Sequence, residues 1–130
     1  MNTRKFAPED HSLVTQWFAA YGWPAPPLDL LPALGLIAYD ETQAYACGWL
    51  YRTDSTLCLL EWVVADKTCD AEKRSLAIDL VMETLSKKAE QDGFRCIFAS
   101  IKNESLRQRY ENLGFVTTDT GITNLLRRIF

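Results

Sequence analysis

Histidine is almost missing from this chain of 130 residues, because His11 is the only one. A single imidazole argues against most Ser-His-Asp, Cys-His and histidine-rich metal arrangements. The four cysteines, Cys47, Cys58, Cys69 and Cys96, include no C-x-x-C pair and follow no signal peptide. The sequence therefore predicts reduced thiols and no metal site. We expect His11 to be a capping or surface residue near the start of a helix.

Long apolar runs and positive charge are also lacking. No run approaches the roughly 20 apolar residues that a membrane span needs. The formal net charge is −3, so there is no basic field to attract nucleic-acid phosphates. These features predict a soluble, cytoplasmic protein with neither nucleic acid nor membrane as a partner. The acidic charge favours a cationic small substrate.

The composition is otherwise that of an ordinary globular domain. Hydrophobic residues make up 48% of the chain and charged residues 24%, which argues against disorder. A chain of this length is sufficient for one sizeable core and too short for two ordinary domains. The sequence therefore predicts a single domain over residues 1–130.

Hydrophobic periodicity and turn residues predict alternating strands and helices. We expect helices over residues 11–21, 28–34, 70–91 and 103–113, and strands over residues 3–6, 36–40, 44–53, 57–65, 95–101, 115–118 and 122–129. The succession of strand, long helix and strand from residue 57 to residue 101 predicts a right-handed βαβ crossover, so part of the sheet should be parallel. Gly48, inside one strand, is expected to mark a bulge.

The segment from Asn103 to Phe115 carries the most specific pattern. Asn103 is a good N-cap because its side-chain oxygen can accept from an amide of the first helical turn. Gly114 is suited to end the helix in the left-handed conformation. Tyr110 shares a helix face with Leu106, which predicts that the tyrosine points inward.

The order of elements and the spacing N-x6-Y-x3-G-F resemble the GNAT superfamily of acetyl-CoA-dependent N-acetyltransferases over nearly the whole chain. The resemblance implies an α/β (α+β) fold of three layers, with a mixed sheet of about six to seven strands and about four helices. It implies acetyl-CoA as co-substrate, a contact of Asn103 with the pantetheine arm, and Tyr110 as general acid. A phenol titrating at about 10 holds its proton at neutral pH and can give it to a departing thiolate. The alternative is that Tyr110 is simply a core residue.

The pyrophosphate loop of this family, normally Q/R-x-x-G-x-G/A, matches poorly. The best alignment places Glu72–Ala77 in its window, and no glycine occurs between Gly48 and Gly93. Asp66 and Asp70 add negative charge that would repel phosphates. The sequence therefore predicts a degenerate loop.

The cofactor contacts implied by the resemblance fall into separate groups. Backbone groups of residues 62–64 would pair with the pantetheine amides as an added strand does. The cations of Lys73 and Arg74, with small residues after them, would stand in for the loop, or else the two cations form a solvated helix face. The implied cofactor-binding residues are Trp62, Val63, Val64, Lys73, Arg74, Ser75, Leu76, Ala77 and Asn103.

Glu61 is the candidate general base. It is the lone interruption of an apolar strand, where a carboxylate is costly unless it is paired, hydrogen-bonded or facing a cavity. An amine titrating at about 10.4 is mostly protonated at pH 7, so a base is needed to free its lone pair. The alternative is an ion pair with an arginine such as Arg52 or Arg95.

Three aromatic residues near the N-terminus, Trp17, Tyr21 and Trp23, are candidates for a pocket that binds a cationic acceptor. The alternative, which is commoner for such residues, is that they belong to the core. The resemblance as a whole implies an enzyme that moves an acetyl group directly from acetyl-CoA to a primary amine of a small molecule or protein. It also suggests a homodimer.

Two other functions remain open. The lost glycines would suit a non-catalytic GNAT-like binding or assembly module that no longer binds acetyl-CoA. A regulator that binds acyl-CoA without turnover is the third possibility.

Overall fold

A five-stranded sheet organises residues 1–100 in the computed structural model, which describes all 130 residues. Residues 101–130 form a second compact unit, and each unit is described by itself. The strands follow one another in chain order across the sheet: β1 (Asn2–Lys5), β2 (Leu34–Tyr39), β3 (Ala44–Tyr51), β4 (Leu57–Ala65) and β5 (Cys96–Phe98). The first three pairings are antiparallel and the β4–β5 pairing is parallel. The predicted mixed sheet is therefore confirmed.

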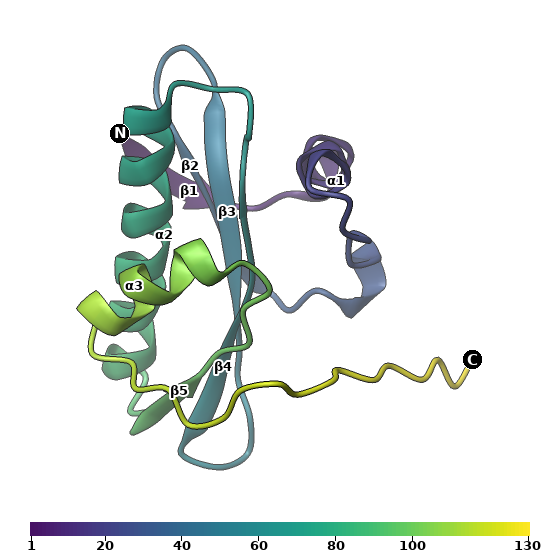
Figure 1. Ribbon diagram of the computed structural model, residues 1–130, viewed down its shortest axis with the longest axis vertical. Coiled ribbons are helices and arrows are strands. Elements are labelled where there is room, and N and C mark those ends of the chain that lie inside the picture. The colour runs from purple at the N-terminus through teal and green to yellow at the C-terminus, as the bar shows by residue number, and fades with distance from the viewer. The chain divides into compact units, whose positions relative to one another are not determined.

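Two α-helices cover opposite faces of this sheet (Figure 1). They are α1 (His11–Ala20) and α2 (Ala71–Gln91), and α2 is the crossover between β4 and β5. Short 3-10 turns, η1 (Pro8–Asp10) and η2 (Leu28–Leu30), flank α1 along the chain. The first unit thus has the helix–sheet–helix layering expected from the sequence. No helix in the protein combines the length and the apolar character that crossing a membrane requires.

Alternation along β3 divides the core between the two faces. Cys47 and Trp49 are fully buried and belong to a cluster with the α1 residues Val14, Trp17 and Phe18. Gly48 faces the other helix, because a Cβ added there would lie 3.0 Å from a Val81 methyl group of α2. The absent side chain lets α2 approach β3 closely.

The bulge predicted at Gly48 is present, and its extra residue lies in the partner strand. The β3–β4 register changes between the pairs Cys47–Val64 and Trp49–Glu61, so two residues of β4 lie opposite one residue of β3. Trp62, one of these two, has a φ of 62° and is the only non-glycine residue with positive φ. A bulky side chain in this region of φ is strained.

Several predicted elements differ from the structure. The helix expected over residues 28–34 is only the turn η2, since Pro32 holds the preceding Leu31 in extended geometry, with ψ of 138°. The strand expected over residues 95–101 is shortened to β5. The strands expected over residues 115–118 and 122–129 are absent, because apolar alternation makes a strand only where a partner strand supplies hydrogen bonds. The structure therefore has five strands and three α-helices, fewer of each than predicted.

Candidate functional site

The parallel strands β4 and β5 stay together for only a short distance. Their paired residues are Leu57–Leu59 in β4 and Cys96–Phe98 in β5. Beyond Leu59, β4 continues to Ala65 without a strand partner on its β5 side. An extended ligand can add to such an edge through main-chain hydrogen bonds. We call residues 60–65 of β4 the open edge.

Trp62, Val63 and Val64, predicted to contact the cofactor through their backbone, all lie on the open edge. The Trp62 indole N–H donates to the Tyr51 hydroxyl at 2.8 Å, and this hydroxyl donates to the Leu30 carbonyl at 2.7 Å. The Trp62 ring also packs edge-on against Phe18 of α1, with ring centroids 6.3 Å apart. Side-chain contacts on the α1 face therefore hold the strained bulge in the middle of the open edge.

Glu61 is the second residue of this open edge and is half-buried. Its carboxylate accepts a hydrogen bond from the backbone N–H of Ser100 at 3.0 Å. It forms no ion pair, and Arg52 instead pairs with Asp92 at 2.6 Å. Burial raises the pKa of the Glu61 carboxyl to about 7, and the Ser100 hydrogen bond opposes this shift. A carboxyl with a pKa near the operating pH is suited to act as a general base.

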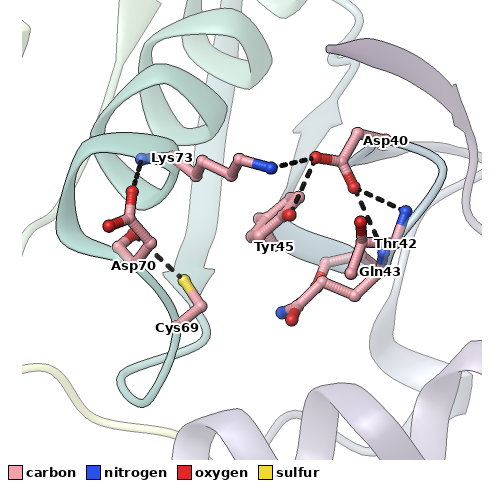
Figure 2. A network of polar contacts seen from close by, with 8 residues as sticks. Asp40, Thr42, Gln43, Tyr45, Cys69, Asp70 and Lys73 are labelled. Carbon is pink, nitrogen blue, oxygen red and sulfur yellow. Dashed lines mark hydrogen bonds and ion pairs between the residues drawn. The ribbon is translucent and has the colours of Figure 1, made fainter.

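The N-terminus of α2 is occupied by the chain's own groups. Asp70 is the N-cap, and its carboxylate accepts from the Lys73 backbone N–H at 3.0 Å. The Lys73 ammonium lies 2.9 Å from the Asp40 carboxylate, in the turn between β2 and β3 (Figure 2). Lys73 is thus exposed to solvent but already has an anionic partner.

Asp40 is the centre of this network. Its carboxylate accepts from the Tyr45 hydroxyl at 2.8 Å and from the backbone N–H groups of Thr42 and Gln43 at 2.8 and 3.2 Å. The Lys73 ammonium, together with these hydrogen bonds, holds the pKa of Asp40 well below its usual range. The β2–β3 turn is therefore tied to the first turn of α2. Sequence reasoning missed this role of Asp40, although the run D-E-T-Q after a strand is typical of an aspartate-stabilised turn.

The remaining residues of the predicted phosphate loop are also accounted for. Arg74 Nη1 donates to the carbonyls of Lys67 and Cys69 at 2.9 and 3.5 Å. Ser75, Leu76 and Ala77 lie within α2, after its first turn, where backbone N–H groups donate to carbonyls of the preceding turn. The amides of the first turn belong to residues 71–73.

The three predicted substrate-binding aromatics have different environments. Trp17 is a core residue with 4% of its surface exposed. Tyr21 and Trp23 are half-buried and stacked, with ring centroids 4.6 Å apart and planes inclined by 15°. The Lys67 ammonium lies 5.2 Å from the Tyr21 ring centroid. A cation therefore already lies over one of the two accessible rings.

The second unit contains α3 (Glu104–Asn112). As predicted, Asn103 is its N-cap, and the side-chain oxygen accepts from the Ser105 N–H at 3.0 Å. Tyr110 is the only buried residue of α3, which confirms that it points inward.

The G-F of the N-x6-Y-x3-G-F pattern has a clear structural role at the end of α3. Gly114 has a φ of 92° and donates to the Glu111 carbonyl at 3.0 Å, while the Phe115 N–H donates to the Tyr110 carbonyl at 3.0 Å. These two bonds form a Schellman motif, which requires the left-handed conformation that glycine adopts readily. The Phe115 ring packs edge-on against Tyr110 with centroids 5.1 Å apart. The spacing of tyrosine, glycine and phenylalanine is thus also the spacing of a helix terminus.

The fold is shared with solved proteins described as acetyltransferases, one of them as a GNAT-family protein. A probable acetyltransferase of known structure matches with a TM-score of 0.73 at 17% identity, over 100% of this chain and 99% of its own. A Mycobacterium tuberculosis protein solved in complex with CoA matches with a TM-score of 0.75 at 16% identity, over 95% of this chain and 76% of its own. A GNAT-family acetyltransferase from Streptococcus pneumoniae has a TM-score of 0.67 at 13% identity, over 98% and 97% of the two chains. Neither a protein-family model nor a curated protein sequence matches the chain.

Proposed function

We propose that this protein is an acetyltransferase that moves an acetyl group from acetyl-CoA directly to a primary amine of a small molecule or protein. The observation that carries the proposal is the open edge of β4 with the Glu61 carboxyl at its start. The edge offers main-chain groups to the amides of a pantetheine arm. The carboxyl offers a proton acceptor beside it.

Glu61 would accept the proton of the attacking amine, directly or through water. Freeing the lone pair of an amine that titrates at about 10.4 costs about 4.6 kcal/mol at pH 7. The nitrogen then attacks the thioester carbonyl, and the C–S bond breaks as the thiolate leaves. Tyr110 is the proposed donor of a proton to this sulfur, on the strength of its register in the family pattern.

Similarity to solved structures supports acetyl-CoA as the acetyl donor. The fold is shared with proteins described as acetyltransferases, and two of the matching proteins were solved with CoA. The four thiols are free, and with the acidic net charge they fit a cytoplasmic enzyme acting on a cationic acceptor. Tyr21 and Trp23 are the candidate acceptor-binding aromatics.

A second candidate is a non-catalytic GNAT-like module that has lost acetyl-CoA binding. It is favoured by the state of the α2 N-terminus, where Asp70 caps the helix and Lys73 and Arg74 are both bonded within the chain. These contacts leave fewer groups for phosphates than a glycine-rich loop provides.

Acetyl transfer by wild type, Glu61→Gln and Tyr110→Phe to a panel of primary amines separates the two candidates. We expect measurable transfer by the wild type, and losses of about 10²-fold or more in kcat/KM for each variant with thermal stability retained. Binding of acetyl-CoA with no transfer to any amine would favour a regulator. Absence of both binding and transfer would favour the non-catalytic module.

A further inference from the structure

We propose that the donor site recognises the acyl-pantetheine half of the thioester and makes little use of the nucleotide half. The substrate class is then acyl-pantetheine thioesters, whether the arm belongs to CoA, to free pantetheine or to a carrier protein. This inference rests on the proposed function and concerns which part of the donor supplies the binding energy.

The positive end of α2 is partly neutralised by the chain's own carboxylates. A helix N-terminus attracts phosphate because its first N–H groups lack partners and its dipole favours negative charge. Here the Asp70 carboxylate takes the Lys73 N–H at 3.0 Å. Asp66 lies four residues earlier, and Glu72 lies in the first helical turn. Phosphates approaching this end of α2 therefore meet carboxylates, and one of the first-turn amides is already taken.

The two cations near this end of α2 are held by other groups. To reach a phosphate, Lys73 must leave Asp40, whose carboxylate lies 2.9 Å from its ammonium. Arg74 must leave the carbonyls of Lys67 and Cys69. Each move exchanges one charge-assisted contact for another, so the net gain from a bound phosphate is small.

The backbone before α2 also lacks a cradle for phosphates. Helical bonding starts at once, since the Arg74 N–H donates to the Asp70 carbonyl at 2.9 Å. No glycine lies between Gly48 and Gly93, so the loop has no residue without a Cβ to allow close approach of phosphate oxygens. The Leu76 side chain, 56% exposed, projects from the next turn.

The open edge of β4 remains as a binding site for the pantetheine half of the donor. Residues 60–65 have no strand partner on the β5 side, and main-chain pairing does not depend on the side chains that have changed near α2. The chain thus retains the contacts for an extended arm and lacks those for a pyrophosphate.

Titration calorimetry with CoA and with pantetheine tests the inference without an acceptor. We expect the two dissociation constants to differ by less than about tenfold, the ratio that corresponds to about 1.4 kcal/mol. A preference for CoA of about tenfold or more would overturn this inference and leave the proposed function standing. Binding of neither ligand would overturn both.

An Asp70→Asn variant tests the cause, because asparagine remains a good N-cap while its charge is removed. We expect it to bind CoA more tightly and pantetheine as before. Glu83→Gln, an exposed charge change further along α2, is the matched control and should alter neither. If Asp70→Asn leaves CoA binding unchanged, the carboxylate does not disfavour phosphate and the inference is wrong.

A comparison of kcat/KM for three donors shows which molecule carries the pantetheine arm. The donors are acetyl-CoA, acetyl-pantetheine and an acetylated phosphopantetheinyl carrier protein. The inference predicts turnover of acetyl-pantetheine comparable to that of acetyl-CoA, and a higher kcat/KM for the carrier thioester would identify a protein-borne donor. Turnover of acetyl-CoA alone would contradict it.

Discussion

The Glu61 carboxylate accepts from the Ser100 backbone N–H at 3.0 Å, two residues beyond the last pair of the β4–β5 ladder, Leu59 and Phe98. A side chain thus bridges the two chain segments just beyond the last main-chain pairing. The contact marks the start of the open edge and orients the proposed base at the same time. The same carboxylate thus takes part in the contact between the two segments and in the proposed proton transfer.

The pH dependence of transfer should follow Glu61. The base must be deprotonated to accept a proton, and its pKa is raised to about 7, so kcat/KM should rise with pH and level off above about 7. Glu61→Gln should remove this inflection and lower kcat/KM by about 10²–10⁴-fold. An unchanged inflection in the variant would assign it to another group.

The stability of the protein should also depend on Glu61. The pKa rises from the ordinary 4.5 to about 7 on folding, so the folded state binds the proton more tightly, and wild type loses stability as pH rises through this window. Glu61→Gln has no such loss. The free energy of unfolding of Glu61→Gln, taken relative to that of wild type, should therefore be about 1–2 kcal/mol higher at pH 8 than at pH 4. This is less than the full pKa shift would give, because solvent reaches the carboxyl. Urea unfolding at both pH values measures the difference, and equal differences would contradict the raised pKa.

Gly35 should not tolerate a side chain. A Cβ there would lie 2.2 Å from the indole nitrogen of Trp49, which is fully buried. Gly35→Ala should destabilise the protein by about 1–3 kcal/mol, since the packed indole has little room to move. In a Trp49→Leu background the same change should cost less, because the clashing ring is gone. Equal costs in the two backgrounds would show that the clash is relieved by backbone movement.

The Asp40 network should stabilise the fold at neutral pH. Its pKa is lowered chiefly by Lys73, so the stabilisation is present above its ordinary pKa of 3.8 and is lost as pH falls below that value. Asp40→Asn should lower the melting temperature at pH 7, and the difference from wild type should shrink in acid. Asp54→Asn, in the β3–β4 turn, is the control because Asp54 has no hydrogen bond or ion pair. A similar effect of both variants would contradict a specific role for Asp40.

Local sequence patterns predicted the elements that carry the site with good accuracy. The apolar run 57–65 and the helix 70–91 match β4 and α2 within one residue, because each has a continuous pattern and a clear end. Glu61 was identifiable because it is the only charge in its run. The final strands were wrong since alternation cannot show whether a partner strand is present.

The contacts that occupy the cations of the predicted phosphate loop could not be predicted from the sequence. Lys73 and Arg74 were recognised as cations near the start of a helix, but their partners Asp40 and Lys67 are fixed by tertiary structure. The same holds for Ser100, which lies beyond the end of β5 and donates its N–H to Glu61. The sequence identified these charged groups, but the tertiary contacts determine which of them remain available to a ligand.

Both proposals require that the open edge of β4 binds the pantetheine arm of an acyl thioester. Titration of the ¹⁵N-labelled protein with acetyl-CoA, followed by amide chemical shifts, tests it most directly. We expect saturable shifts of the Trp62, Val63 and Val64 amides, reproduced by acetyl-pantetheine. The absence of any shift at these amides at millimolar concentrations of both ligands would contradict it.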